Sequence, residues 1–111
     1  LLNKPFSIVG SGRQTRDFIN INDVAEAFVA SAFSKLNNKI FNIGTGKAQS
    51  IIYLTKLLKG KKIHIKKRLG ETKYSRANIS KVKKLLKWKP KISFEKAINE
   101  LLKTHANKIK N

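Results

Sequence analysis

Two glycine-rich turns are the first features of this sequence whose residue types could do chemistry. Gly44-Thr-Gly46-Lys47 is similar to the end of a phosphate-binding P-loop, but that motif requires glycine where Phe41 stands and serine or threonine where Ala48 stands. Neither this turn nor Gly10-Ser-Gly12 has the third glycine of a dinucleotide-binding fingerprint. Taken alone, therefore, neither turn predicts a cofactor site.

The sequence lacks the residues that nucleophilic catalysis or metal binding would require. The chain contains no cysteine, no Gly-x-Ser-x-Gly elbow and no Tyr-x-x-x-Lys pair. Its two histidines, His64 and His105, are too few to hold a metal ion without thiolates. His64 alternates with Ile63 and Ile65 in a predicted strand, so we expect it to face solvent rather than to act as a base. The sequence thus predicts no catalytic residue and no metal ligand.

Positive charge dominates the composition. The chain carries 25 Lys and Arg against 6 Asp and Glu, a formal charge of +19, and residues 59–91 hold a single acid, Glu71. Clustered cations favour a polyanion such as nucleic acid, because binding releases phosphate counterions. However, most of the cations are lysines, which are typical of a solvated helix face, and only Tyr74 and Trp88 could stack on bases within the basic stretch. We therefore favour an ordinary charged surface and expect no nucleic-acid partner.

Length and composition predict one thin folded domain. At 111 residues and 41% hydrophobic content, the chain can form a core but leaves much of its surface wet. No apolar run approaches the roughly 20 residues of a membrane span, and the start does not have the pattern of a signal peptide. The absence of cysteine is consistent with the cytoplasm. Because the sequence begins at Leu1 and contains no methionine, we expect it to be part of a longer chain.

The hydrophobic pattern predicts short strands that alternate with helices, an α/β arrangement. We expect extended segments at residues 6–9, 17–21, 39–43 and 62–65. We expect helices at residues 24–34, 51–58, 79–86 and from 94 to the region of Ile109.

Several residues should begin or end these helices. Asp23 followed by Glu26 has the spacing of a capping box, and Ser50 and Ser93 precede two other helices. Gly60 is typical of a helix end. The first helix should bury a stripe made of Val24, Phe28 and Ala32, and the third should bury Ile79, Val82, Leu85 and Leu86 while Lys81, Lys83, Lys84 and Lys87 face water.

Five segments in order resemble the extended short-chain dehydrogenase/reductase family, which includes UDP-glucose 4-epimerases and nucleotide-sugar dehydratases. They cover nearly the whole chain, from Lys4 to about Lys103. They are Gly10-Ser-Gly-Arg-Gln-Thr-Arg-Asp-Phe-Ile-Asn-Ile-Asn-Asp-Val-Ala25, Phe41-Asn-Ile-Gly-Thr-Gly46, Arg68-Leu-Gly-Glu71, Ala77-Asn-Ile-Ser-Lys81 and Leu85-Leu-Lys-Trp-Lys-Pro90.

The resemblance implies that residues 1–111 are the C-terminal, nucleotide-sugar-binding portion of such an enzyme. In this family an N-terminal Rossmann domain binds NAD and supplies the catalytic Tyr-x-x-x-Lys, which this sequence lacks. The chain alone would then be inactive, and the intact enzyme would be a homodimer. Two other interpretations remain open: a stand-alone basic module that binds a polyanion, and a truncated remnant without function.

The resemblance also assigns binding roles to residues. Arg16 and Arg68 match arginines that hold the substrate diphosphate, Glu71 matches an acid that contacts nucleotide hydroxyls, and Gln14 and Asn42 are further candidates. A planar guanidinium suits phosphate oxygens better than an ammonium does. In the alternative interpretations, Arg16 forms a surface pair with its neighbour Asp17 and Arg68 is merely solvated. The family's usual proline after the second arginine is replaced by Leu69, which frees the backbone of that loop.

Overall fold

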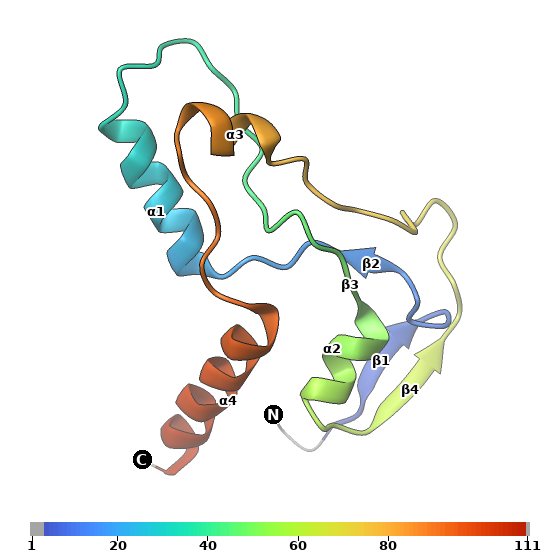
Figure 1. Cartoon of the computed structure of the whole chain (residues 1–111). Helices are drawn as coiled ribbons and strands as arrows, with labels where there is room; N and C mark the ends of the chain where they lie inside the picture. Colours follow the sequence, from blue (N-terminus) through green and yellow to red (C-terminus); the bar gives the residue numbers. More distant parts are fainter. Residues whose placement is uncertain (1–3, 111) are drawn as a thin grey trace.

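The computed structural model describes the main chain of residues 4–110 and the side chains up to residue 106, and it has the predicted α/β character (Figure 1). The described strands are β1 (Phe6–Val9), β2 (Thr15–Arg16), β3 (Gln49–Ser50) and β4 (Lys62–Ile65). The described helices are α1 (Ile21–Ala32), α2 (Ile51–Leu57), α3 (Ser80–Leu85) and α4 (Phe94–Lys110).

The strands form two small two-stranded sheets. β1 and β4 run parallel, with Phe6 opposite Lys62, and α2 precedes β4 and contacts β1. β2 and β3 run antiparallel, with Thr15 opposite Ser50. His64 of β4 is exposed as expected, and its Nδ1 atom lies 2.7 Å from the carbonyl oxygen of Gly10. The second sheet joins the segment after β1 to the start of α2, so it places residues 14–16 beside that helix start.

The prediction of a strand at residues 39–43 is wrong for the described chain. Phe41 and Ile43 pack against the core while Ile40 and Asn42 are exposed, which is the alternation of a strand. No main-chain hydrogen bond joins this segment to another described residue, however, and a strand requires a neighbour. The strand in this part of the chain is instead Gln49–Ser50, which pairs with β2.

The start of the first helix also differs from the prediction. Asn20, not Asp23, is the N-cap, and its side chain accepts a hydrogen bond from the amide of Asn22 at 2.8 Å. Asp23 is 1% exposed and accepts main-chain hydrogen bonds from Lys91 and Ile92. A tertiary contact therefore uses the carboxylate that the capping-box pattern had assigned to the helix end, and residues 17–20 belong to no strand.

The predicted buried stripe of α1 is likewise wrong for the described chain. The buried residues of α1 are Asp23 and Ala27, whereas Phe28 is 73% exposed and Ala32 is exposed. The reason is that the helix is apolar on two sides, and the described elements cover only one of them.

The other helix signals agree better with the structure. The Ser50 and Ser93 hydroxyls accept from the amides of Tyr53 and Lys96, as helix caps do. The turn after α2 has its positive φ at Lys59 rather than at Gly60, where an added Cβ would lie 2.1 Å from the Phe6 ring. In α3 and beside it, Ile79 and Val82 are buried and Lys81, Lys83, Lys84 and Lys87 are exposed, as predicted. Leu85 is 39% exposed, so its predicted burial is wrong. The side chain of Ile109 lies outside the described residues.

The core is small and lies between α1 and α3. It contains Ala27, Ile79, Val82 and Trp88, with Phe41 and Ile43 packed against it. The indole Nε1 of Trp88 donates to the carbonyl oxygen of Asp23 at 3.1 Å, which joins α1 to the segment after α3. The molecule is flat, 48 × 42 × 18 Å, with a radius of gyration of 16.9 Å. A compact domain of this length would have a radius of about 13 Å.

Candidate functional site

Asp17, the residue after β2, holds three separate segments together. Its carboxylate accepts hydrogen bonds from the amides of Thr45 at 2.8 Å, Gly46 at 2.9 Å and Ala77 at 3.1 Å, and from the Thr45 hydroxyl. An added Cβ at Gly44 would lie 2.6 Å from the Ala77 side chain, so glycine is required for this close approach. The glycine-rich turn thus surrounds an internal carboxylate rather than a phosphate.

Electrostatics favour the charged form of Asp17. Burial raises the pKa of its carboxyl, but the hydrogen bonds from Thr45, Ala77 and Gly46 outweigh burial and hold the pKa below its ordinary value of 3.8. Asp17 therefore stays ionised at neutral pH and fixes β2 against the turn and the segment before α3. It forms no ion pair with Arg16, its neighbour in sequence.

Gln14, Arg16 and Glu71 meet although 57 positions separate the first from the last. Gln14 Nε2 donates to the carbonyl oxygen of Val9 at 2.9 Å and lies 3.4 Å from Glu71 Oε1. Arg16 Nη2 lies 3.7 Å from the same carboxylate oxygen. The side chains of Arg16 and Glu71 are 32% and 23% exposed, so the cluster is half-buried and accessible to a ligand.

The main chain orients the guanidinium of Arg16. Its Nη1 donates to the carbonyl oxygens of Thr15 and Thr72, each at 2.8 Å, and the amide of Thr15 donates to the carbonyl oxygen of Lys73 at 2.9 Å. These contacts fasten β2 to the loop that carries Glu71. Nη2, whose one described contact is the ion pair, is directed towards Glu71 and can serve an incoming anion.

A hollow of about 420 Å³, here called the Gln14 hollow, lies beside this cluster. Gln14 and Glu71 line it together with Arg13, Lys67, Lys73 and Tyr74. Three cations and an aromatic ring on one rim suit a charged, planar ligand such as a nucleotide. Sequence reasoning missed these four residues, because their shared position depends on the fold; the basic stretch and its aromatic residue were the available signal.

The two remaining candidates are placed differently. Asn42 is exposed and lines a second hollow, of about 680 Å³, which also borders Arg16. Arg68 is exposed in the loop after β4, and no hydrogen bond or ion pair joins it to another described residue. The structure therefore brings Gln14, Arg16 and Glu71 together, places Asn42 at a different hollow and leaves Arg68 apart.

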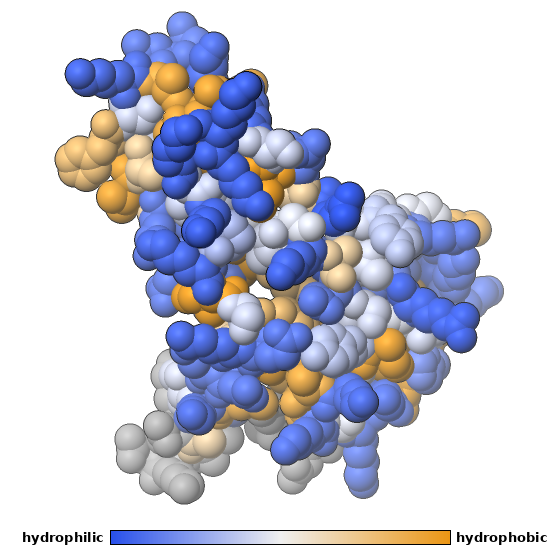
Figure 2. All heavy atoms as spheres, in the orientation of Figure 1, coloured by the Kyte–Doolittle hydropathy of each residue, from blue (hydrophilic) through white to orange (hydrophobic). Residues whose placement is uncertain are grey.

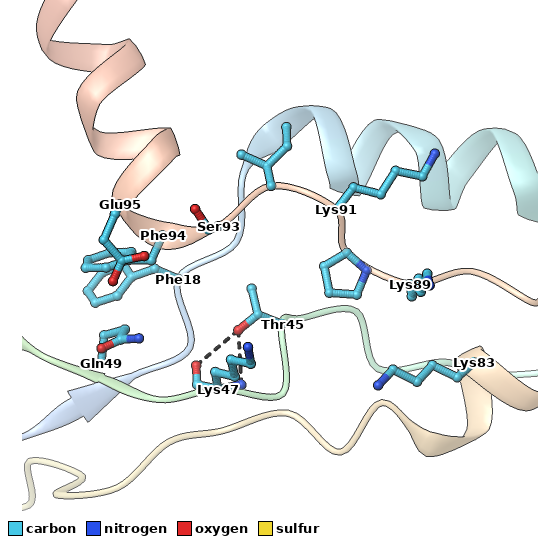
Figure 3. Close-up of a pocket in the computed structure, with 12 residues that line it drawn as sticks. Phe18, Thr45, Lys47, Gln49, Lys83, Lys89, Lys91, Ser93, Phe94 and Glu95 are labelled. Carbon is cyan, nitrogen blue, oxygen red and sulfur yellow. Dashed lines mark hydrogen bonds between the residues drawn. The ribbon is translucent and has the colours of Figure 1, made fainter.

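Another basic hollow, here called the lysine hollow, lies at the start of α4 (Figure 3). Phe18 and Phe94 lie side by side at one end of it, with ring centres 5.3 Å apart, and Lys83 and Lys89 lie at the other end. The ammonium group of Lys91 is 2.7 Å from Glu26. No candidate residue from the sequence lines this hollow.

The short strands and intervening helices are typical of an α/β protein, and the comparisons with known proteins identify its family. A sequence model described as GDP-mannose 4,6 dehydratase matches residues 2–101. The chain belongs to this family of nucleotide-sugar epimerases and dehydratases. It is 39% identical over 102 residues to the UDP-glucuronate 4-epimerase of Thermodesulfobacterium geofontis, covering 86% of this chain and 31% of that protein.

Solved structures agree with the sequence comparison. The UDP-glucose 4-epimerase of Thermotoga maritima, solved with UDP-glucose, matches with a TM-score of 0.88 at 29% identity, over 96% of this chain and 36% of that one. The UDP-glucuronic acid 4-epimerase of Bacillus cereus, solved with UDP-glucuronic acid and NAD, matches with a TM-score of 0.80 at 33% identity, over 87% and 33%. The chain thus spans about a third of the length of these relatives. Within the described residues, no helix is long and apolar enough to cross a membrane.

Proposed function

We propose that this chain is the C-terminal, substrate-binding portion of an NAD-dependent nucleotide-sugar epimerase or dehydratase of the cytoplasm, and that the intact enzyme is a homodimer. Its own task is to hold the nucleotide diphosphate while the sugar reacts. The observation that carries this proposal is the convergence of Gln14, Arg16 and Glu71, from two distant segments, beside a hollow with a basic rim.

The division of roles follows from the donors and acceptors present. Nη1 of Arg16 is fixed by carbonyl oxygens, and Nη2 is directed towards Glu71. The guanidinium is therefore already oriented, and its N–H groups on the Nη2 side can donate hydrogen bonds to phosphate oxygens. Glu71 can accept hydrogen bonds only, which suits the hydroxyl groups of a ribose. Arg68, on its exposed loop, would close over the diphosphate from the other side, and Asn42 would contact the part of the substrate beyond Arg16. Such positioning lets the sugar turn while its nucleotide stays anchored.

The glycine-rich turn at residues 44–46 does not fit the phosphates of NAD. The amides of Thr45 and Gly46, which a dinucleotide phosphate would need, are already bound to Asp17. We therefore place the cofactor and the catalytic residues outside the third of the enzyme that this chain represents. When bound there, NAD would supply the redox chemistry, and this chain would orient the substrate.

Titration of the isotope-labelled chain with UDP-glucose, followed by amide NMR, tests the proposal. The largest shifts should fall on residues 13–16 and 67–74, and Arg16→Ala should remove them while leaving the circular dichroism spectrum unchanged. Arg16→Lys is the matched variant, since it keeps the charge but loses the planar fork and should bind roughly tenfold more weakly. Shifts spread over the lysine hollow instead would contradict the proposal.

A parallel titration with single-stranded DNA separates the polyanion interpretation from this one. Polyanion binding should weaken steeply with the logarithm of salt concentration, because several counterions are released. Binding of one diphosphate should weaken far less. A steep salt dependence for DNA combined with no response to UDP-glucose would favour a basic module.

A further inference from the structure

Two neighbouring hollows form one groove with a basic lining. The lysine hollow has a volume of about 440 Å³, and a further hollow of about 430 Å³ lies between the turn at residues 44–46 and the start of α3. Thr45, Lys47 and Lys83 line both of them, so the two hollows adjoin and are here together called the lysine groove. The side chain of Lys83 extends from α3 towards the turn that carries Thr45 and Lys47 (Figure 3).

The fold gathers unpaired cations in this groove from distant parts of the chain. Lys47 follows the turn at residues 44–46, Arg76 precedes α3, Lys83 lies on α3 and Lys89 follows it. All four side chains are exposed, and no ion pair joins any of them to another described residue. A concave surface lined by charges of one sign concentrates ions of the opposite sign. The groove is therefore suited to an anion with several charges.

The remaining polar groups of the lining are largely used within the chain. Glu95, the one acid that lines the groove, accepts a hydrogen bond from the Tyr53 hydroxyl at 2.9 Å. The Asn78 side chain accepts from the Ser80 amide at 3.0 Å. The free charged groups are thus all hydrogen-bond donors, since neither lysine nor arginine can accept. Phosphate oxygens match such a lining, whereas an acidic peptide would bring main-chain N–H groups that also need acceptors.

The aromatic residues of the groove are not arranged to receive bases. Phe18 and Phe94 stack on each other, with ring centres 5.3 Å apart and planes at 27°, and the Tyr53 ring lies 5.9 Å from that of Phe94. Proteins that bind single-stranded nucleic acid instead offer free aromatic faces along a basic groove. A chain of phosphates without bases is therefore the ligand that fits better.

We propose that the lysine groove binds a linear chain of phosphates, of which inorganic polyphosphate is the simplest. Ammonium groups on flexible stems follow closely spaced phosphates without imposing one geometry, and Arg76 adds a planar guanidinium at one end. The groove shares no lining residue with the Gln14 hollow. It is thus a second anion site, and it does not depend on the proposed function.

Calorimetry of the 111-residue chain with linear polyphosphate of defined length tests the groove. The triple variant Lys47→Gln, Lys83→Gln and Lys89→Gln should bind roughly tenfold more weakly or worse, because three phosphate contacts are lost. The slope of log affinity against log salt concentration should also fall by about two, since each contact with a single strand contributes roughly 0.7.

A second triple variant, Lys61→Gln, Lys62→Gln and Lys66→Gln, is the matched control. It removes the same charge from exposed positions on and beside β4, outside the groove, and should bind nearly as well as the parent chain. The control is needed because hydrophilic residues cover much of the molecular surface (Figure 2). Circular dichroism checks that both variants fold.

Amide NMR of the unsubstituted chain locates the ligand without any variant. Polyphosphate should shift residues 45–49, 76–83 and 89–95 most. The proposal is overturned if the two triple variants lose affinity equally or if the largest shifts fall on residues 13–16 and 67–74. Tighter binding in the groove of single-stranded DNA with the same number of phosphates would also overturn it, in favour of a nucleic-acid site.

Discussion

The carboxylate of Asp23 accepts a hydrogen bond of 3.0 Å from the main-chain amide of Lys91, 68 positions later in the chain. The amide of Ile92 donates to the other oxygen at 3.0 Å, and Asp23 is 1% exposed. This contact ties α1 to the segment that leads into α4. One buried side chain thus fixes the position of the two residues that lead into the last helix.

Asp23→Ala should therefore lower the free energy of unfolding by about 3 kcal/mol, because two main-chain amides in partly buried hydrogen bonds lose their acceptors. Urea unfolding followed by Trp88 fluorescence measures the loss. Glu26→Gln is the control: it removes the ion pair with the Lys91 ammonium group, both partners of which are largely exposed, and should leave the midpoint unchanged. Equal losses in the two variants would contradict the structural role of Asp23.

Acid should destabilise the chain through Asp17. Its pKa in the folded state is held below 3.8 by hydrogen bonds, so the folded chain binds a proton less readily than the unfolded chain. The stabilisation is complete above about pH 4 and is lost as the pH falls through the folded pKa. Asp17→Asn should cost about 2 kcal/mol at neutral pH, and the difference from the parent chain should shrink below about pH 4. Unfolding curves at several pH values test both; a constant difference would be the contrary result.

Gly44→Ala should destabilise the fold by close contact. The added methyl group would lie 2.6 Å from the Ala77 side chain and 2.7 Å from the Asp17 carboxylate, which we expect to cost about 2 kcal/mol. Gly70→Ala provides a comparison without crowding, since no atom lies within 4 Å of its added Cβ and only the positive φ of 77° is unfavourable. That variant should lose about 1 kcal/mol. Thermal melts would refute this account if they ranked the two losses in the opposite order.

Glu71→Gln should reduce recognition of the ribose rather than of the phosphates. In the proposed site, the carboxylate accepts hydrogen bonds from nucleotide hydroxyls, and an amide accepts them more weakly. The variant should bind UDP roughly tenfold more weakly and should bind a dideoxy analogue of UDP about as well as the parent chain does. Calorimetry with the two ligands gives the comparison. A similar loss for both would assign Glu71 to holding Arg16 instead.

Local signals in the sequence were sufficient where one segment contains its own partners. Ser50 and Ser93 cap helices because each accepts from an amide three residues later, and both caps were predicted. The start of the first helix was predicted wrongly, because Asn20 and Asp23 are both residue types that favour the N-cap position. Only the position of Lys91, far along the chain, decides that Asp23 serves a different purpose.

Longer-range features could be predicted only in part. Residues 39–43 have the side-chain alternation of a strand, but pairing depends on a neighbour that the pattern cannot supply. Resemblance to a family named Gln14 and Glu71 separately as candidates, but their contact was not predicted, because nothing local joins residues 57 positions apart. Lys67 and Tyr74 were missed at the Gln14 hollow, since the fold alone brings them to the same rim.

Side chains on the two sides of the extended segment around Arg16 contact different parts of the chain. Gln14 and Arg16 face Glu71, whereas Asp17 turns the other way, to the Thr45 turn. In the proposed site, substitutions at Gln14 and Arg16 would alter the contacts with a ligand, whereas a substitution at Asp17 would release the turn that this residue anchors. Under the proposed function, a change in ligand preference would begin on one side of a strand that is only two residues long.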